Sequence, residues 1–195
     1  MSQRLIVGLS GASGVIYGIR LLEVLRARPD VETHLVVTKP AERTIVEETP
    51  YRVADVKALA SVVHRVTDVG ASIASGSFRT MGMVVVPCSI HTVSAIAYCQ
   101  SDNLLTRAAD VVLKEGRKLV LVVRETPLHR GHLKSLLAAA EAGAVILPPV
   151  PAFYGLPKTL EDVIDHTVGR VLDLFGIAHD LVRRWGEAPG PQGEP

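Results

Sequence analysis

A cation and an acid follow one another directly at the end of a strongly apolar segment. The sequence LVLVVRETPL places residues 119–123, a run typical of a buried strand, immediately before Arg124 and Glu125. Pro127 then prevents the strand from continuing. Charged groups at the mouth of a core are costly to desolvate unless something there needs them. We therefore predict that this segment borders a site, with Arg124 as a candidate for holding an anion.

A glycine-rich loop, GLSGASG at residues 8–14, joins a strand-like segment to a helix-like one. Glycines allow close ligand approach, and the following helix offers its first backbone amides to an anion. The spacing GxxGxxG differs from the dinucleotide fingerprint and from a Walker loop, and the next strand ends in Thr38-Lys39 without a clear ribose-binding acid. The loop favours a mononucleotide over NAD or ATP, although a tight strand-to-helix turn would have the same pattern.

Further polar groups follow other strand-like segments. PCSIHT at residues 87–92 offers hydroxyl and thiol donors suited to a phosphate monoester, although an ordinary capped helix explains it equally well. PAFYGLP at 151–157 is an aromatic loop between prolines, either a lid or a packed connection. The candidate cations are Arg107, Lys114, Arg124 and Arg170. Each could instead be a solvated helix charge, an explanation that is strongest for Arg107 and Lys114, whereas the position of Arg124 at a strand end favours the site.

The elements that must position these groups alternate along the chain. We expect strands at 4–10, 33–38, 83–87, 118–123 and 144–149, and helices at 15–27, 40–48, 89–99, 103–116, 128–143 and 159–177. Solidly apolar strands between helices indicate a parallel sheet covered on both faces. We predict a single doubly wound, mainly parallel α/β sheet, a Rossmann or flavodoxin-like three-layer αβα arrangement. Ligands bind such sheets at the carboxyl ends of the strands, so the segments 8–14, 38–40, 87–92 and 124–127 should share one edge.

Bulk composition narrows the class of protein. The 195 residues are 48% hydrophobic and 21% charged, which indicates one globular domain, expected over residues 1–186, with a disordered Pro- and Gly-rich tail at 187–195. A net charge of +1 and 4% aromatic residues give no reason to expect nucleic acid or an acidic membrane as a partner. No apolar run approaches the roughly 20 residues of a membrane helix. Cys88 and Cys99 fit a reducing compartment, so we expect a soluble cytoplasmic protein.

Taken together, these motifs resemble the UbiX-type flavin prenyltransferases, including the members that accompany hydroxyarylic acid decarboxylases. The similarity covers nearly the whole chain and is carried by IVGLSGASGVIYGIRLLEVL, ASGSF, GMVVVPCSIHTVSAIA, DNLLTRAADVVLKEGRKLVLVVRETPL, HLKSLLAAAEAGAVILPPVPAFYGLP and VGRVLDLFGI. The chain departs from the family pattern in EGRK at 115–118, in SIHT at 89–92 and in YCQSDN at 98–103.

The resemblance implies that reduced FMN receives a dimethylallyl group from dimethylallyl phosphate at flavin N5 and C6. The product, prenylated FMN, would pass to a UbiD-type decarboxylase. The implied flavin site consists of Gly11, Ala12, Ser13, Thr38, Ser89, Ile90, His91, Thr92 and Arg124. The implied binders of the prenyl phosphate are Tyr154, Arg170, Lys114 and Arg124, and the implied catalytic groups are Glu125, Lys114, Ser13 and Glu48. The resemblance also implies a homo-oligomer, a dodecamer of stacked trimers with sites at subunit interfaces.

The chemistry of phosphate loss fits these residues. Negative charge develops on the leaving oxygen, and fixed cations stabilise it. Most prenyl transferases use Mg²⁺ on a DDxxD helix, and because that motif is absent we expect Lys114, Arg124 and Arg170 to replace the metal. Glu125 would relay a proton as a general acid or base.

Two other functions remain open from the sequence. One is decarboxylation of a peptidyl or pantothenoyl cysteine, which is expected to need an active-site His after the first helix, and none is evident there. The other is a non-catalytic flavin carrier, which would have no use for Glu125 or Lys114.

Overall fold

The computed structural model describes residues 3–182 and 184 of the chain. Two compact units make up the fold: a sheet unit, Met1–Pro149, and a C-terminal unit, Val150–Pro195. A single domain over 1–186 stays a prediction. The tail at 187–195, expected to be disordered, lies outside the described residues.

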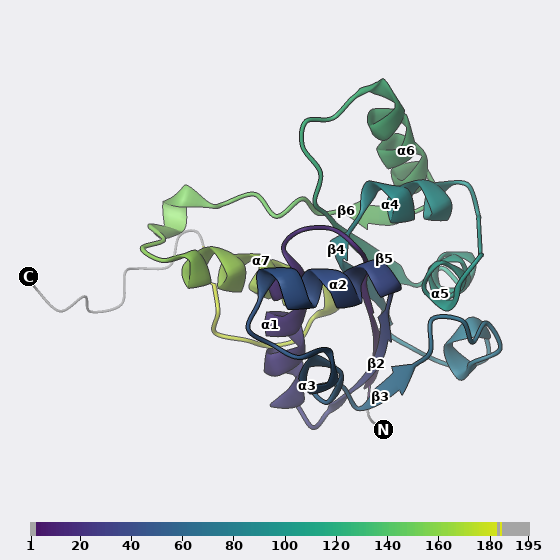
Figure 1. Cartoon of the computed structure of the whole chain (residues 1–195), viewed down its shortest axis with the longest axis horizontal. Helices are drawn as coiled ribbons and strands as arrows, with labels where there is room; N and C mark the ends of the chain where they lie inside the picture. Colours follow the sequence, from purple (N-terminus) through teal and green to yellow (C-terminus); the bar gives the residue numbers. More distant parts are fainter. Residues whose placement is uncertain (1–2, 183, 185–195) are drawn as a thin grey trace, which may run out of the picture. The chain divides into compact units, whose positions relative to one another are not determined.

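The sheet unit is built on six parallel strands in the order β3-β2-β1-β4-β5-β6 (Figure 1). The strands are β1 (Gln3–Leu9), β2 (Val31–Val37), β3 (Val62–His64), β4 (Gly82–Cys88), β5 (Lys118–Val123) and β6 (Ala144–Ile146). This confirms the predicted doubly wound sheet. The strand order reverses between β1 and β4, which is where ligands bind in folds of this kind.

Helices cover both faces of this sheet and explain why its strands are so apolar. They are α1 (Val15–Arg26), α2 (Lys39–Glu48), α3 (Val53–Lys57), α4 (Ile90–Ala97), α5 (Leu104–Lys114) and α6 (Arg130–Glu141). Every residue of β4 is buried. An added Cβ at Gly18 of α1 would come within 2.3 Å of the Val86 carbonyl oxygen, so glycine lets α1 approach β4 closely. This contact packs the first half of α1 against the place where β1 and β4 lie side by side.

The region at residues 49–81, where the sequence predicted neither a helix nor a strand, contains three short elements. They are α3, β3 and the 3₁₀ helix η1 (Ser72–Ala74). The strand β3 has three residues and pairs only with β2, so it presents no long apolar run from which a strand could be predicted.

The C-terminal unit contains the 3₁₀ helix η2 (Phe153–Gly155) and the helix α7 (Leu160–Phe175). A capping box begins α7: the Asp162 amide donates to Thr159 Oγ1 at 3.2 Å, and the Thr159 amide donates to Asp162 Oδ2 at 2.9 Å. Gly176, at φ +68°, ends the helix in the left-handed region. Among the residues that the structure describes, no helix combines the length and the apolar character needed to span a membrane.

Candidate active site

The loops that follow β1 and β4 are held together by one hydroxyl group. Ser10 Oγ donates to the Pro87 carbonyl oxygen at 3.0 Å and accepts a hydrogen bond from the Ser89 amide at 2.8 Å. The Ser10 amide also donates to the Pro87 carbonyl, at 3.2 Å. Ser10 is buried, so these hydrogen bonds are shielded from water. The two loops therefore form one rigid cradle at the carboxyl edge of the sheet.

Three helices begin at this edge and bring partial positive charge to it. The Thr38 hydroxyl caps α2 by accepting from the Ala41 amide at 3.3 Å, and the Ser89 hydroxyl caps α4 by accepting from the Thr92 amide at 3.2 Å. The N-cap of α1 is Gly14, at φ +90°, and its amide donates to Glu48 Oε2 at 2.8 Å. Helix N-termini and hydroxyl groups are the donor set that a phosphate monoester needs. The residues present therefore fit the phosphate end of FMN.

Gly11 allows the β1–α1 loop to lie against α2. A Cβ atom at this position would come within 2.2 Å of Pro40 Cβ, which is closer than real contacts allow. Ser13, two residues later in the same loop, is exposed. Gly11 thus has a packing reason to be glycine that the motif alone does not reveal.

We predict that Gly11→Ala lowers stability and weakens FMN binding, because the loop or α2 must move to relieve the contact with Pro40. Forcing an extra methyl group into such a contact typically costs about 1–3 kcal/mol. Thermal denaturation and FMN titration measure the two effects. Gly70→Ala is the matched control in the same unit, because its added Cβ meets only Asp68 Oδ1 at 3.6 Å. Equal stability and FMN affinity in the two variants would contradict the prediction.

Arg124 and Glu125 both lie exposed where β5 ends. The Arg124 amide donates to the Cys88 carbonyl oxygen at 3.1 Å, which places the segment directly beside the end of β4. Glu125 Oε1 accepts from the Thr126 amide at 3.2 Å. The segment therefore borders the cradle, with a cation and a carboxylate available to a ligand.

Tyr17, in the first turn of α1, is a candidate neighbour of Arg124 that was not predicted from the sequence. Burial raises the pKa of Tyr17, and the nearby positive charge of Arg124 partly opposes this rise. The phenol and the guanidinium therefore lie close enough to interact electrostatically. The available signal was its place three residues after Gly14, on the helix that follows the glycine-rich loop.

Lys114 lies at the other edge of the sheet from Arg124 and Glu125. It ends α5, four residues before β5 begins at Lys118, whereas the acid and the cation follow the far end of β5. Its ammonium group pairs with the Glu115 carboxylate. Within one chain, therefore, the structure brings the implied flavin and catalytic residues of the sheet unit to the carboxyl edge with the exception of Lys114. The further candidate cation Arg107 lies within α5, where its Nη1 donates to Asp110 Oδ2 at 2.8 Å.

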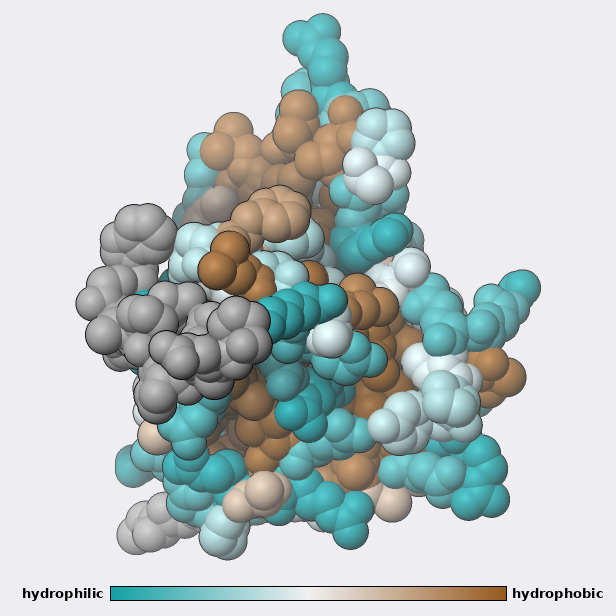
Figure 2. Space-filling view, turned by 90° about the vertical axis from the view of Figure 1, so that its left-hand side faces the viewer, coloured by the Kyte–Doolittle hydropathy of each residue, from teal (hydrophilic) through white to brown (hydrophobic). Residues whose placement is uncertain are grey.

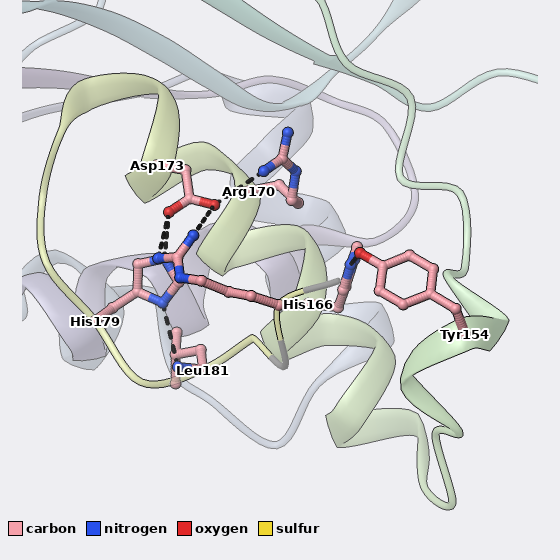
Figure 3. Close-up of polar contacts among 7 residues, drawn as sticks. Tyr154, His166, Arg170, Asp173, His179 and Leu181 are labelled. Carbon is pink, nitrogen blue, oxygen red and sulfur yellow. Dashed lines mark hydrogen bonds and ion pairs between the residues drawn. The ribbon is translucent and has the colours of Figure 1, made fainter. Parts of the chain in front are cut away.

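In the C-terminal unit, Tyr154 of η2 contacts His166 of α7, and Arg170 lies one turn farther along α7 (Figure 3). The Tyr154 hydroxyl lies 3.1 Å from His166 Nε2, and the two rings meet edge to face, with centroids 5.8 Å apart. Burial lowers the pKa of His166, and the positive charge of Arg170 lowers it further. His166 was not predicted as a site residue, although its i, i+4 spacing to Arg170 on α7 was available in the sequence.

Asp173 is the shared partner of several donors in this unit (Figure 3). Its Oδ2 accepts from Arg170 Nη1 at 2.9 Å, and its Oδ1 accepts from Arg184 Nη2 at 2.9 Å and from His179 Nε2 at 3.1 Å. The Leu181 amide donates to His179 Nδ1 at 3.2 Å, so this imidazole donates through Nε2 alone. Burial acts to raise the pKa of Asp173, but the hydrogen bonds from Arg184 and His179 outweigh it, and the pKa lies below its ordinary value.

Comparisons with known proteins identify the family to which the chain belongs. Residues 1–172 match the family model described as Flavoprotein. The chain is 60% identical over 185 residues to the flavin prenyltransferase UbiX of Escherichia coli K12, covering 94% of this chain and 98% of the relative.

Two solved structures are also close. The crystal structure of AnUbiX in complex with FMN and dimethylallyl pyrophosphate aligns with a TM-score of 0.93 and 50% identity, covering 97% of this chain and all of that one. The dodecameric FMN-dependent UbiX-like decarboxylase of Escherichia coli O157:H7 aligns with a TM-score of 0.92 and 53% identity, covering 95% of this chain and all of that one. The chain therefore belongs to the UbiX-type flavin prenyltransferases, within the flavoprotein family.

Proposed function

We propose that this protein is a flavin prenyltransferase that joins a dimethylallyl group from dimethylallyl phosphate to N5 and C6 of reduced FMN. The prenylated FMN would serve a UbiD-type decarboxylase. Besides family membership, the observation that carries the proposal is the place of Arg124 and Glu125. Both lie exposed beside a cradle whose helix N-termini and hydroxyl groups suit a phosphate monoester. An anion site next to a cation and a carboxylate is what transfer from an allylic phosphate requires.

The cradle would hold the flavin substrate through its own backbone and hydroxyl groups. Gly11, Ala12 and Ser13 would contact FMN from the β1–α1 loop, and Thr38 would contact it from the start of α2. Residues 89–92 at the start of α4, which are Ser89, Ile90, His91 and Thr92, would complete the cradle together with Arg124. The rigid link between Ser10, Pro87 and Ser89 supports this role, because it fixes both loops before a ligand arrives.

In the reaction, the allylic C–O bond breaks and its electron pair leaves with the phosphate, while the prenyl carbon bonds to flavin N5. The new bond to N5 displaces the N5 proton. Protonation of the prenyl double bond then lets its tertiary carbon bond to C6, and C6 releases its own proton. Arg124, Arg170 and Lys114 would stabilise the leaving phosphate, and Tyr154 would donate a hydrogen bond to it. Glu125 would accept or relay the proton, and Ser13 and Glu48 would line the reaction space. The exposure of Glu125 and the hydrogen bond from the Gly14 amide to Glu48 support these roles.

The protein would act as a homo-oligomer, and the position of Lys114 is the main argument for this. Since Lys114 lies at the opposite edge of its own sheet, a neighbouring copy would supply it to each site. Figure 2 shows apolar side chains gathered at the upper part of one face. Leu128, just before α6, and Leu133 and Leu137 of α6 are exposed in the single chain. A face of this kind fits burial against further copies, and we propose a dodecamer, as in the relative from Escherichia coli O157:H7. The free thiols of Cys88 and Cys99 support a cytoplasmic location.

Anaerobic incubation with reduced FMN and dimethylallyl phosphate tests the function directly. Mass spectrometry of the released flavin should show the addition of one isoprene unit. Dimethylallyl pyrophosphate serves as a second donor in parallel, because AnUbiX was crystallised with it. Turnover should be unchanged by excess EDTA if cations of the chain replace a metal. Unmodified flavin with both donors would refute the function, and loss of activity in EDTA with recovery in Mg²⁺ would refute the replacement of the metal.

A further inference from the structure

We propose that His166 is a positioning residue that directs the Tyr154 hydroxyl toward the phosphate of the prenyl donor. This inference rests on the proposed function, because it concerns the donor subsite of that reaction. It assigns a role to the imidazole that contacts the Tyr154 hydroxyl.

The geometry joins the two side chains in two ways. The Tyr154 oxygen lies 3.1 Å from His166 Nε2, within hydrogen-bonding distance, and the rings meet at an interplanar angle of 80°. Tyr154 belongs to the short helix η2, whereas His166 belongs to the middle of α7 (Figure 3). The contact therefore ties a short, exposed element to a long helix that begins with a capping box.

The same turn of α7 carries the cation that would hold the phosphate. Arg170 follows His166 by four residues, so both side chains lie on one side of the helix. Burial and the positive charge of Arg170 lower the pKa of His166, which favours the neutral imidazole. Asp173 in turn holds Arg170 at 2.9 Å. Tyr154 and Arg170 thus each have a side chain that fixes their orientation.

The direction of the hydrogen bond decides what Tyr154 can offer a ligand. A phenol has one hydrogen to donate. If His166 Nε2 accepted that hydrogen, it would point at the imidazole instead of the donor. If Nε2 carries the hydrogen of the neutral imidazole, it donates to the phenol oxygen, and the phenol hydrogen turns toward a phosphate oxygen. A phosphate beside Arg170 favours this second arrangement, because its charged oxygens accept strong hydrogen bonds from donors that face them.

Three variants of the full-length enzyme test the role. His166→Gln places an amide nitrogen where Nε2 lies and keeps a donor, whereas His166→Leu removes it. We expect His166→Leu to raise the KM for dimethylallyl phosphate by roughly two- to tenfold, the range of one neutral hydrogen bond, with the KM for FMN unchanged. His166→Gln should restore most of the donor affinity. Tyr154→Phe should raise the same KM, and adding His166→Leu to it should cause little further change.

Glu161→Ala, on the exposed start of α7, controls for general effects on the helix, and melting temperatures identify any variant that fails to fold. Equal impairment in His166→Gln and His166→Leu, or fully additive effects of His166→Leu and Tyr154→Phe, would overturn the role of His166. Calorimetric titration with dimethylallyl phosphate repeats the comparison without turnover. A wild-type enzyme that binds the donor but forms no prenylated FMN would refute the proposed function alone, and the binding data would still judge His166.

Discussion

Glu125→Gln should lower the rate of prenylation by roughly 10²–10⁴-fold, the usual contribution of a positioned general acid or base. The fold and the binding of FMN should be retained. Glu125 is exposed, and its one described contact in the segment is the hydrogen bond that its Oε1 accepts from the Thr126 amide. A glutamine oxygen can accept the same hydrogen bond, so the substitution removes the capacity to take up a proton and little else. Single-turnover formation of prenylated FMN measures the effect.

Arg124→Ala serves as the comparison, because it alters the same segment by a different mechanism. This variant should weaken FMN binding as well as turnover, since it removes a cation beside the cradle. If both residues served only to end β5, each variant would lower the melting temperature while turnover per folded molecule stayed near that of the wild type. Normal turnover in Glu125→Gln would remove the catalytic role.

Mixed oligomers should regain activity that neither parent has. Lys114→Ala alone is expected to lose roughly 10²–10³-fold in turnover, as is typical when one group that stabilises developing charge is removed. If a neighbouring copy supplies Lys114, a site that combines Lys114 from one variant with Glu125 from another is intact. Random mixing of Lys114→Ala and Glu125→Gln subunits would then restore about a quarter of the sites, since each of two independent choices succeeds half the time.

Co-expression of the two variants with different affinity tags, followed by tandem purification, gives the mixed oligomers for this assay. The control is a mixture of wild-type subunits with subunits that carry both substitutions. In this mixture, only wild-type subunits can supply Lys114 and Glu125, so its activity measures what wild-type subunits contribute by themselves. If Lys114 acts within its own chain, every site in the mixed oligomers lacks one group, and activity would remain as low as in the parents.

The sequence predicts the sheet well because its strands are buried on both faces. Residues 119–123 and 83–87 are continuous apolar runs, and the structure places strands over both. The edge strand β3 was missed for the opposite reason, since Val63 remains exposed and the strand has one neighbour. Parallel topology alone brings the loops after β1, β2, β4 and β5 to one edge, so that part of the candidate site follows from the motifs.

Other parts of the site depend on contacts that no local pattern encodes. Tyr17 interacts with Arg124, more than a hundred positions away in the sequence, because α1 packs above the end of β4. His166 contacts Tyr154 because η2 turns back toward α7. The sequence predicts the helix that Lys114 ends. That Lys114 lies at the opposite edge from the other site residues becomes clear only when those residues are placed in the structure.

The rigid link between Ser10, Pro87 and Ser89 also bears on how the product leaves. FMN and its prenylated form have the same ribityl phosphate, so a cradle that is shaped before binding and holds this phosphate would hold both with similar strength. Equal binding of substrate and product neither lowers the barrier of the reaction nor promotes release of the prenylated flavin. Release, and with it the supply of prenylated flavin to a decarboxylase, must then depend on groups that sense the flavin ring system and the prenyl phosphate. Mutations in the cradle should accordingly change the retention of both flavins in parallel.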